Sequence, residues 1–498
     1  MIYASRRWVL AALLLPALIV PISAHATRVP LRFGPPTMIS SETSEAWEPS
    51  LLTDAFGNIF ITARRGTTDL ALAVDERSPT LSRSASWLWM SNDDGKTFTD
   101  VPGYPLDVQN HEWGYEGDLA LDDAGHLYFV DQTYADSTMT RWTVSGLGSI
   151  AMDFHRPFLP TAQPVDDRPF LAAHGDGHAF YAVNSGDAAL NPFGREGGDA
   201  YGPGRFSVYH STDGGTTFDT IGHSLRGSGA CRPAADHRAG APYAYLACTN
   251  DGGVEGPLDA PHGRGTLWAF ASRDDGATYE RFRIGDYNAD AETYDWPLIT
   301  VGPDGDVWVL HVDANRTQTL DDGTVEILSN TLNLFHSTDH GRTWSKHDIT
   351  PESGRYRWGT LIMSTAGDLA LAIQHRTAET SPWRAYAALF APDEKPLVAP
   401  IDSTPVSAAT NPQPPSELIG LGFAHNGALV ASWTRVEGGL RRVYFSKQVV
   451  AAVKGLRKTQ KGSSGPLPST GVDSEPVTAL LVLFIAGALT RRLVPRRS

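Results

Sequence analysis

The chain of 498 residues is poor in cysteine and in basic charge. It has two cysteines, and its 56 acidic against 41 basic residues give a formal net charge of −15 at pH 7. This balance argues against a nucleic-acid-binding protein, whose surface would be basic. Amphipathic helical periodicity is almost absent between residues 40 and 450, which argues against a helical fold. The 48 glycines, 34 prolines and 13 tryptophans instead favour a turn-rich β protein.

One short motif, Ser-x-Asp-x-Gly-x-Thr-aromatic, recurs four times along the chain. In a tight β-hairpin its Asp carboxylate accepts hydrogen bonds from backbone N–H groups, and its Gly takes a conformation closed to other residues. The motif therefore predicts structural turns and says little about chemistry. The four aspartates are Asp93, Asp213, Asp274 and Asp339, in Ser91–Phe98, Ser211–Phe218, Ser272–Tyr279 and Ser337–Trp344.

A second repeat consists of an apolar run, a turn with glycine and another apolar run, a pattern typical of β-hairpins. Seven copies are visible, and successive turn glycines are 52 to 68 residues apart. Self-similarity at such a period is typical of propellers and solenoids. The turn glycines are Gly57, Gly125, Gly177, Gly240, Gly305, Gly367 and Gly427.

The two repeats together predict an all-β fold, a single propeller over residues 27–450 with seven four-stranded antiparallel blades; six blades are the alternative. The glycine turn joins the first two strands of a blade, and the Asp motif joins the last two. Six blades are expected over residues 48–104, 116–155, 166–221, 231–284, 295–349 and 358–397. The seventh shows three strands, and Arg28–Ile39 would supply the fourth and close the ring without an open edge.

The Asp motif resembles the Asp box, or BNR repeat, of sialidase-like β-propellers. The resemblance covers roughly residues 40–450, through the boxes and the repeat pattern alone. It implies structural turns far from the propeller axis. Sialidases of this superfamily have six blades and grip the carboxylate of sialic acid with an arginine triad. Their Arg-Ile-Pro motif is absent here, and its nearest counterparts are Arg168-Pro169 and Arg232-Pro233.

Both ends of the chain carry targeting patterns. Residues 1–26 form a predicted signal peptide, in which Arg6 and Arg7 precede an apolar stretch and a small-residue cleavage site. The same arginines resemble a twin-arginine signal, with an ordinary secretory signal as the alternative. Either pattern predicts an exported protein that begins at Thr27.

After a predicted linker, residues 451–470, the C-terminal part combines Leu-Pro-Ser-Thr-Gly, an apolar segment and an arginine-rich tail over residues 467–498. This order resembles the sorting signal read by sortases, which implies cleavage after Thr470 and attachment to the cell wall. A membrane anchor formed by residues 471–498 is the alternative. The 13 residues of its apolar segment, Val477–Leu489, are fewer than the roughly 20 of a transmembrane helix. The predicted location is the cell surface.

Cys231 and Cys248 fall on the first and second strands of the predicted fourth blade. In an oxidising compartment they would form a disulfide. Two independent buried thiols are the alternative.

The first strand of each blade lines the axis, and ligands of propellers usually bind where these strands begin. Charged residues there are costly to bury unless paired, so they form either a structural network or a ligand site. The residues at these positions are Glu48, Glu116, Asp118, Asp167, Arg168, Arg232, Asp295, Arg357 and Glu417.

An enzymatic site of sialidase type would use the three arginines Arg168, Arg232 and Arg357 on the substrate carboxylate. The acid/base would be Asp167, Glu116 or Asp295, and the nucleophile Tyr294 or Tyr356. Further candidates for this face are two long insertions, Asn184–Gly204 and Asn250–Gly265, and the segment His111–Glu116. The histidines, including His174, His178, His311 and His375, are scattered, so we expect no catalytic metal and no cofactor.

The sequence therefore predicts a monomeric, exported propeller that recognises an extracellular ligand, a glycan or a protein, and binds no nucleic acid. The alternative is a sialidase-type exo-glycoside hydrolase acting on acidic sugars.

Overall fold

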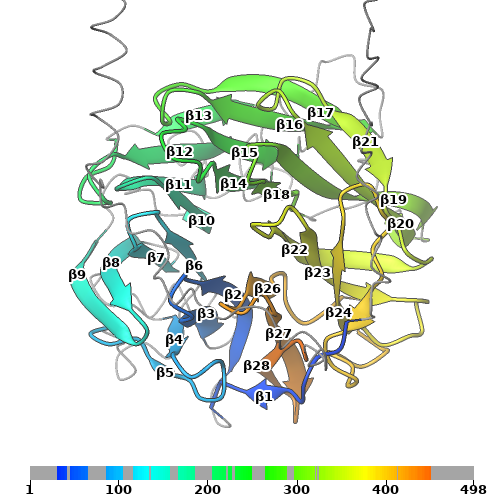
Figure 1. The fold of residues 1–498 in the computed structure, drawn as a ribbon. Helices are drawn as coiled ribbons and strands as arrows, with labels where there is room; N and C mark the ends of the chain where they lie inside the picture. Colours follow the sequence, from blue (N-terminus) through cyan, green and yellow to red (C-terminus); the bar gives the residue numbers. More distant parts are fainter. Residues whose placement is uncertain are drawn as a thin grey trace, which may run out of the picture. The chain divides into compact units, whose positions relative to one another are not determined.

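A computed structural model describes residues 31–41, 45–65, 86–104, 116–133, 136–157, 166–185, 205–219, 222–226, 230–249, 264–288, 296–319, 321, 325–411 and 413–449. Its regular elements are all strands, and they form seven four-stranded antiparallel sheets around one axis (Figure 1). The predicted seven-bladed propeller is confirmed. The predicted signal peptide, linker and sorting signal lie outside the described residues. Within the described ranges, no helix is long and apolar enough to cross a membrane.

Six blades follow the chain from the inner to the outer strand. Blade 1 comprises β2 (Ala46–Thr53), β3 (Ile59–Arg65), β4 (Trp87–Ser91) and β5 (Thr99–Asp100). Blade 2 comprises β6 (Glu116–Leu121), β7 (His126–Thr133), β8 (Asp136–Gly146) and β9 (Ser149–Pro157). Blade 3 comprises β10 (Asp166–His174), β11 (His178–Ser185), β12 (Arg205–Ser211) and β13 (His223–Arg226).

The next three blades repeat this order. Blade 4 comprises β14 (Cys231–Ala235), β15 (Ala244–Cys248), β16 (Arg264–Ser272) and β17 (Glu280–Asn288). Blade 5 comprises β18 (Leu298–Val301), β19 (Val307–Thr319), β20 (Val325–Ser337) and β21 (Ser345–Asp348). Blade 6 comprises β22 (Arg355–Met363), β23 (Leu369–Arg376), β24 (Arg384–Phe390) and β25 (Ala399–Pro400).

Blade 7 joins the two ends of the propeller. Its inner strands are β26 (Gly420–Phe423), β27 (Leu429–Glu437) and β28 (Leu440–Lys447), and its outer strand is β1 (Thr37–Met38). In β1, Thr37 lies opposite Phe445 and Met38 opposite Tyr444. The predicted closure by the N-terminal stretch is confirmed, and it pairs the last strand edge of the ring.

The seven turn glycines read from the sequence all have a positive φ, between 72° and 99°. A residue with a side chain rarely adopts this conformation, so the glycines are required where the inner two strands reverse. In an antiparallel blade, these turns and the Asp-box turns lie at one end of the strands. We call this end the box face. The opposite end, where the inner strands begin, is called the rim face.

The Asp-box turns have the hydrogen bonds that their sequence predicts. The Asp213 carboxylate accepts the Thr217 N–H at 2.7 Å, the Thr217 hydroxyl at 2.7 Å and the Ser211 hydroxyl at 2.9 Å. The turns at Asp93, Asp274 and Asp339 repeat these bonds. Burial alone would raise the pKa of Asp93, but the bonds from Thr97 and Ser91 lower it to about 2.

Each box also contacts the preceding blade. A Cβ on Gly95 would lie 2.2 Å from the Phe445 ring of blade 7, and a Cβ on Gly276 would lie 2.5 Å from the Phe180 ring of blade 3. The box residue Phe98 meets Phe445 edge-to-face, with ring centroids 5.0 Å apart. The boxes therefore seal one blade against the one before it.

Candidate functional site

The rim face is shaped by irregular pairing at the starts of the inner strands. The β2, β10 and β22 ladders each contain a register shift, between Trp47 and Ser50, Asp167 and Phe170, and Arg357 and Gly359. Two non-glycine residues within these shifts have a positive φ, Glu48 at 55° and Trp358 at 40°. Bulges re-aim side chains, and strained residues gather at functional sites, so this end of the axis is the candidate site.

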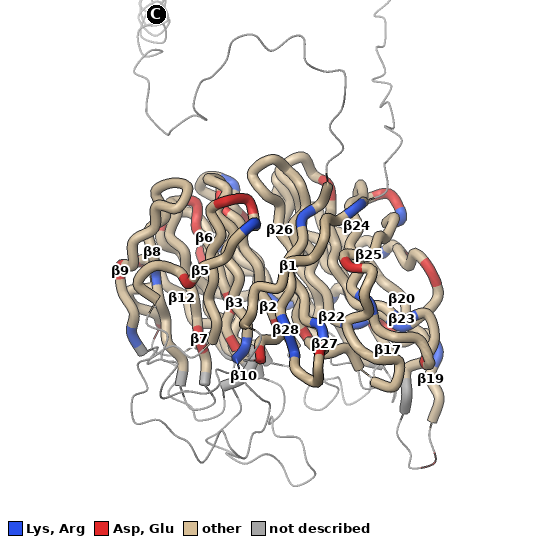
Figure 2. Tube along the Cα trace, turned by 90° about the horizontal axis from the view of Figure 1, so that it is seen from below, with Lys and Arg blue, Asp and Glu red and all other residues tan. Residues whose placement is uncertain are grey.

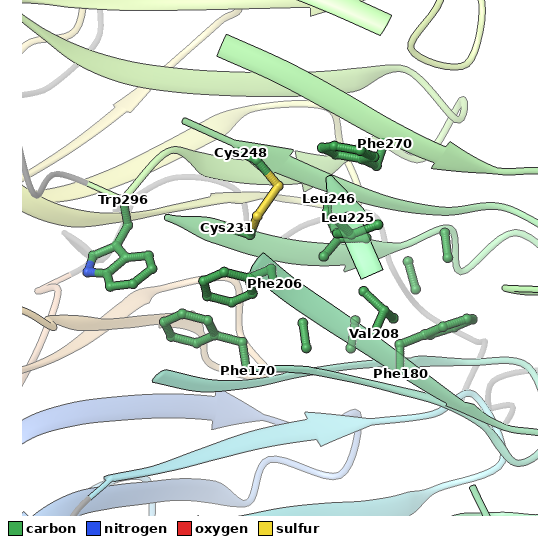
Figure 3. Close-up of a cluster of buried hydrophobic side chains, with 14 of the residues drawn as sticks. Phe170, Phe180, Phe206, Val208, Leu225, Cys231, Leu246, Cys248, Phe270 and Trp296 are labelled. Atoms are coloured by element: carbon green, nitrogen blue, oxygen red, sulfur yellow. A yellow bond between two sulfur atoms is a disulfide. The ribbon is translucent and has the colours of Figure 1, made fainter. Parts of the chain in front are cut away.

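Aromatic side chains line the axis below this rim. One apolar cluster joins Phe170 of blade 3, Trp296 before β18, Trp358 of blade 6 and Leu418 before β26. The rings of Phe170 and Trp296 meet edge-to-face at 5.3 Å (Figure 3). The tryptophans each follow a residue that the sequence placed on the axis, Asp295 and Arg357. Blades 5 and 6 therefore each contribute a tryptophan to this cluster.

Arg232 is the half-buried cation of this site. Its guanidinium lies 4.1 Å from the centre of the Phe170 ring, a cation–π contact between blades 4 and 3. Asp118 of blade 2 lies within its electrostatic reach. The structure therefore brings Arg232 onto the aromatic cluster, beside a carboxylate.

Asp118 links three blades. Its Oδ1 accepts the Ser50 hydroxyl at 2.8 Å, and its Oδ2 accepts the Leu171 N–H at 2.9 Å. Burial raises the pKa of Asp118, and the charge of Arg232 together with these hydrogen bonds opposes that rise. Both carboxylate oxygens are thus engaged by the protein itself.

Arg357 lies deeper than a sialidase-type clamp would require. It is 2% exposed, and its guanidinium lies 4.1 Å from the centre of the Trp358 ring. Arg357 and Arg232 therefore contact rings of the same cluster, from blades 6 and 4. Arg168 and Asp167 lie in β10, but their side chains are outside the described residues, as are Tyr294 and Asp295. The structure therefore does not test convergence of the three arginines.

Tyr356 is not placed as a nucleophile. Its hydroxyl donates to the Glu352 carbonyl at 2.9 Å, and its ring stacks on His375 at 4.2 Å. Burial raises the pKa of Tyr356. The side chain packs inside the blade and its hydroxyl already has a partner, which does not favour the predicted role. Glu116 is also buried, at the start of β6.

Of the buried arginines, only Arg357 was expected from the sequence. In the described residues, the buried arginines all lie near the rim end of a strand in blades 1, 6 and 7. Most of them lie over tryptophan rings, such as Arg64 over Trp47 at 4.3 Å and Arg376 over Trp383 at 4.9 Å. In the sequence, these residues could have been recognised as arginines at the end of a strand next to a loop, as in Arg64-Arg65 and Arg441-Arg442. The set comprises Arg64, Arg65, Arg355, Arg357, Arg376 and Arg442.

Three buried charged residues on the box face are acidic. Asp54, Asp122 and Asp236 are buried at the first turns of blades 1, 2 and 4, where they accept backbone N–H groups of their own turns. In Figure 2, basic segments lie near the lower ends of β22, β27 and β28, and others lie along the upper edge beside acidic ones. The buried arginines of the described residues therefore lie toward the rim face, where buried carboxylates such as Glu48 and Glu116 accompany them.

A disulfide lies directly beneath the rim. Cys231 and Cys248 are paired across β14 and β15, with the sulfurs 2.07 Å apart (Figure 3). Both cysteines are fully buried in the aromatic cluster. The bridge ties the strand that carries Arg232 to its neighbour.

No family model and no curated protein matches the chain. Among solved structures, a protein of unknown function from Dyadobacter fermentans is 14% identical, with a TM-score of 0.43, over 84% of this chain and 98% of that one. A Penicillium chrysogenum alpha-L-arabinanase is 11% identical, with a TM-score of 0.41, over 84% and 98%. NanB sialidase from Streptococcus pneumoniae is 10% identical, with a TM-score of 0.43, over 83% and 70%. At these values the likenesses assign no ligand or activity.

Proposed function

We propose that the rim face binds an extracellular acidic glycan, with Arg232 as the contact to a carboxylate of the sugar. The observation that carries the proposal is the position of Arg232, half-buried over Phe170 and at the start of an inner strand. A guanidinium pairs with a carboxylate in two parallel hydrogen bonds. The Phe170 ring against which Arg232 lies is itself buried, so it supports the guanidinium, and Arg232 is the contact that a ligand would reach.

The charge distribution supports an anionic ligand. The chain has a net charge of −15, which repels anions in general. Buried arginines on the rim face nevertheless include Arg355, Arg357 and Arg376 in blade 6 alone. Buried carboxylates such as Glu48 and Glu116 share this face, so the excess of arginine over these carboxylates would attract an acidic ligand.

Binding is favoured over hydrolysis because a candidate nucleophile among the described residues already has a hydrogen-bond partner. Asp118, an axial carboxyl that was not a candidate acid/base, likewise uses both oxygens to hold neighbouring blades together. Tyr356, a candidate nucleophile, donates its hydroxyl to a backbone carbonyl. A general acid and a nucleophile must instead reach the substrate. A sialidase-type hydrolase is kept as the alternative, because Arg168, Asp167, Tyr294 and Asp295 are untested.

The binding proposal predicts the effect of Arg232→Ala. Loss of a charge-assisted hydrogen bond of about 1.5–3 kcal/mol should weaken binding of a sialylated oligosaccharide roughly 10- to 150-fold. Titration calorimetry of the full chain measures this, with Arg283→Ala as the matched control. Arg283 lies in the outer strand β17 with its side chain 59% exposed, so its removal should leave affinity unchanged.

Three results would count against this proposal. A wild type that binds sialylated, uronic-acid-containing and neutral oligosaccharides equally weakly has no acidic-glycan site. An Arg232→Ala variant that loses thermal stability, while the wild type binds none of these sugars, would assign Arg232 a structural role. Release of the fluorophore from a fluorogenic sialoside by the wild type would establish the hydrolase alternative.

We also propose that the propeller is displayed outside the cell through its C-terminal end. The last described strand, β28, ends at Lys447 on the box face, where Lys447 contacts the box residue Asp94 of blade 1. The chain therefore leaves the propeller on the face opposite Arg232.

The predicted sorting site tests the display proposal. Thr470→Ala should move the protein from the cell-wall fraction to the membrane or the medium, because a sortase cleaves after this threonine in the family that the motif resembles. Fractionation with an antibody to the propeller measures the shift, and Ser469→Ala is the matched control. Unchanged wall retention of Thr470→Ala would contradict sortase attachment.

A further inference from the structure

We propose a transition-metal site, selective for Zn²⁺ over Ca²⁺ and Mg²⁺, formed by His174, His178 and Asp275 on the box face between blades 3 and 4. The three residues each offer one ligand atom, and these atoms all lie within 4.8 Å of one another. The site is separate from the rim face, since the strands β10 and β16 cross the propeller between them.

The fold brings the two histidines together in one hairpin. His174 ends β10 and His178 begins β11, and the two lie directly opposite each other in the antiparallel ladder. Their rings stack with centroids 5.1 Å apart. Residues opposite in a ladder point to the same side of the sheet. In the sequence, three residues separate His174 from His178, a spacing that suits two ligands of one metal ion.

The third ligand comes from the Asp box of the next blade. Asp275 is the residue between the box aspartate and the box glycine, and its φ is 55°. Its Oδ1 lies 3.8 Å from His174 Nε2. A Cβ on Gly276 would lie 2.5 Å from the Phe180 ring, which places this turn directly against the blade that carries the histidines. The box thus delivers a carboxylate to the imidazoles.

Two buried nitrogens point to a ligand at this place. His174 is 3% exposed, and its Nε2 has no hydrogen-bond partner among the described residues. The Nδ1 of His178 is also buried and without such a partner. Buried polar atoms are normally satisfied, and an unsatisfied one costs about 1–3 kcal/mol. A coordinated metal would satisfy both atoms at once.

The donors select the metal class. Two imidazoles and one carboxylate are the ligands of Zn²⁺ and related transition metals, whereas Ca²⁺ and Mg²⁺ prefer oxygen donors throughout. In a tetrahedral zinc site with bonds of about 2.0–2.1 Å, ligand atoms lie roughly 3.3–3.5 Å apart. The three residues must therefore draw together by up to about 1.5 Å through side-chain rotation. The Asp275 side chain is 39% exposed, which gives an ion access from solvent.

A second carboxylate, on blade 2, contacts the turn of the hairpin that carries the two histidines. Asp123 of blade 2 accepts the Gly175 N–H at 2.7 Å and contacts His237 Nδ1 at 2.9 Å. It fixes the turn between the two histidines and adds negative charge near them. Such outer partners orient metal ligands and strengthen their affinity. The metal would therefore act as a clasp between blades 3 and 4, on the same face as the boxes.

Zinc titration of the full chain, prepared without a histidine tag and stripped with a chelator, tests the site. We expect saturable binding of one Zn²⁺ per chain by calorimetry, with a rise in melting temperature, because an ion that binds only the folded state stabilises it. Co²⁺ in the same site should give visible absorption bands typical of tetrahedral coordination. Ca²⁺ at equal concentration should produce neither effect.

Two ligand variants and one control locate the ion. His178→Ala and Asp275→Asn should each weaken Zn²⁺ binding more than about tenfold, since even outer partners contribute 10- to 100-fold. Asn tolerates a positive φ, so Asp275→Asn keeps the turn intact and remains informative if His178→Ala misfolds. His347→Ala removes an exposed histidine of β21 and should have no effect. Absence of saturable binding by the wild type, or equal binding by Asp275→Asn and wild type, would overturn the proposal.

Discussion

Replacing Gly95 by Ala should lower the free energy of unfolding by about 2–5 kcal/mol, the sum of a backbone and a packing cost. The backbone cost, about 1–2 kcal/mol, arises because Gly95 has a φ of 80°, which a residue with a Cβ adopts at a penalty. The packing cost arises because that Cβ would lie 2.2 Å from the Phe445 ring of blade 7. Urea unfolding of the wild type and the variant measures the difference.

Gly427→Ala separates the two contributions. Gly427 has a φ of 77°, almost that of Gly95, but a Cβ there would meet nothing within 4 Å. Its substitution should therefore cost only the backbone penalty, about 1–2 kcal/mol. Equal losses for Gly95→Ala and Gly427→Ala would mean that the contact between the box and the preceding blade is not tight, and would remove the sealing role of the boxes.

The conformation of the turn glycines also explains why the fold could be predicted from the sequence. Turn glycines such as Gly57 and Gly427 mark reversals that no other residue makes easily, so their spacing counts the blades. The Asp boxes depend on hydrogen bonds within five residues, as between Asp213 and Thr217. Requirements that involve only neighbouring residues can be recognised in a short stretch of sequence. The closure by β1 was predictable because blade 7 had only three strands of its own.

The rim could be predicted less well because its geometry depends on register shifts. A bulge adds one residue without a composition signal, and one residue decides which side chain faces the axis. In blade 6 the ladder shifts between Arg357 and Gly359, so that Trp358 joins the axial cluster and Arg357 lies over its ring. The roles of Tyr356 and Asp118 depend on partners in other strands, which the sequence does not reveal.

The site of His174, His178 and Asp275 could be predicted only in part from the sequence. His174 and His178 are close in sequence, whereas Asp275 follows about one hundred residues later. Once the blades are in order, the box of blade 4 must lie against blade 3, as the box of blade 1 lies against blade 7. Their proximity therefore follows from the repeat, and it could have been predicted by applying the blade order to the hairpin turns.

Deleting residues 31–39 should destabilise the protein more than any substitution considered above. The segment buries Leu31 in a cluster with Trp383 and Trp433, and packs Met38 against the same cluster. Two such side chains contribute about 1.5–3 kcal/mol each, and backbone hydrogen bonds about 0.5–1.5 kcal/mol each. Those bonds include Gly34 N–H to the Lys447 carbonyl at 2.9 Å and Ile39 N–H to the Val443 carbonyl at 3.0 Å. We expect a total loss of roughly 5 kcal/mol or more.

The deletion should also change the association of the protein. Without β1, β28 becomes an edge strand whose backbone groups are open to pairing with another molecule. Scanning calorimetry should therefore show a lower melting temperature, and size-exclusion chromatography should show dimers or aggregates. Removal of residues 451–498, beyond the propeller, is the control and should leave both unchanged. A monomeric deletion variant with the wild-type melting temperature would show that blade 7 holds the ring closed with three strands, because its contacts with blades 6 and 1 would then suffice.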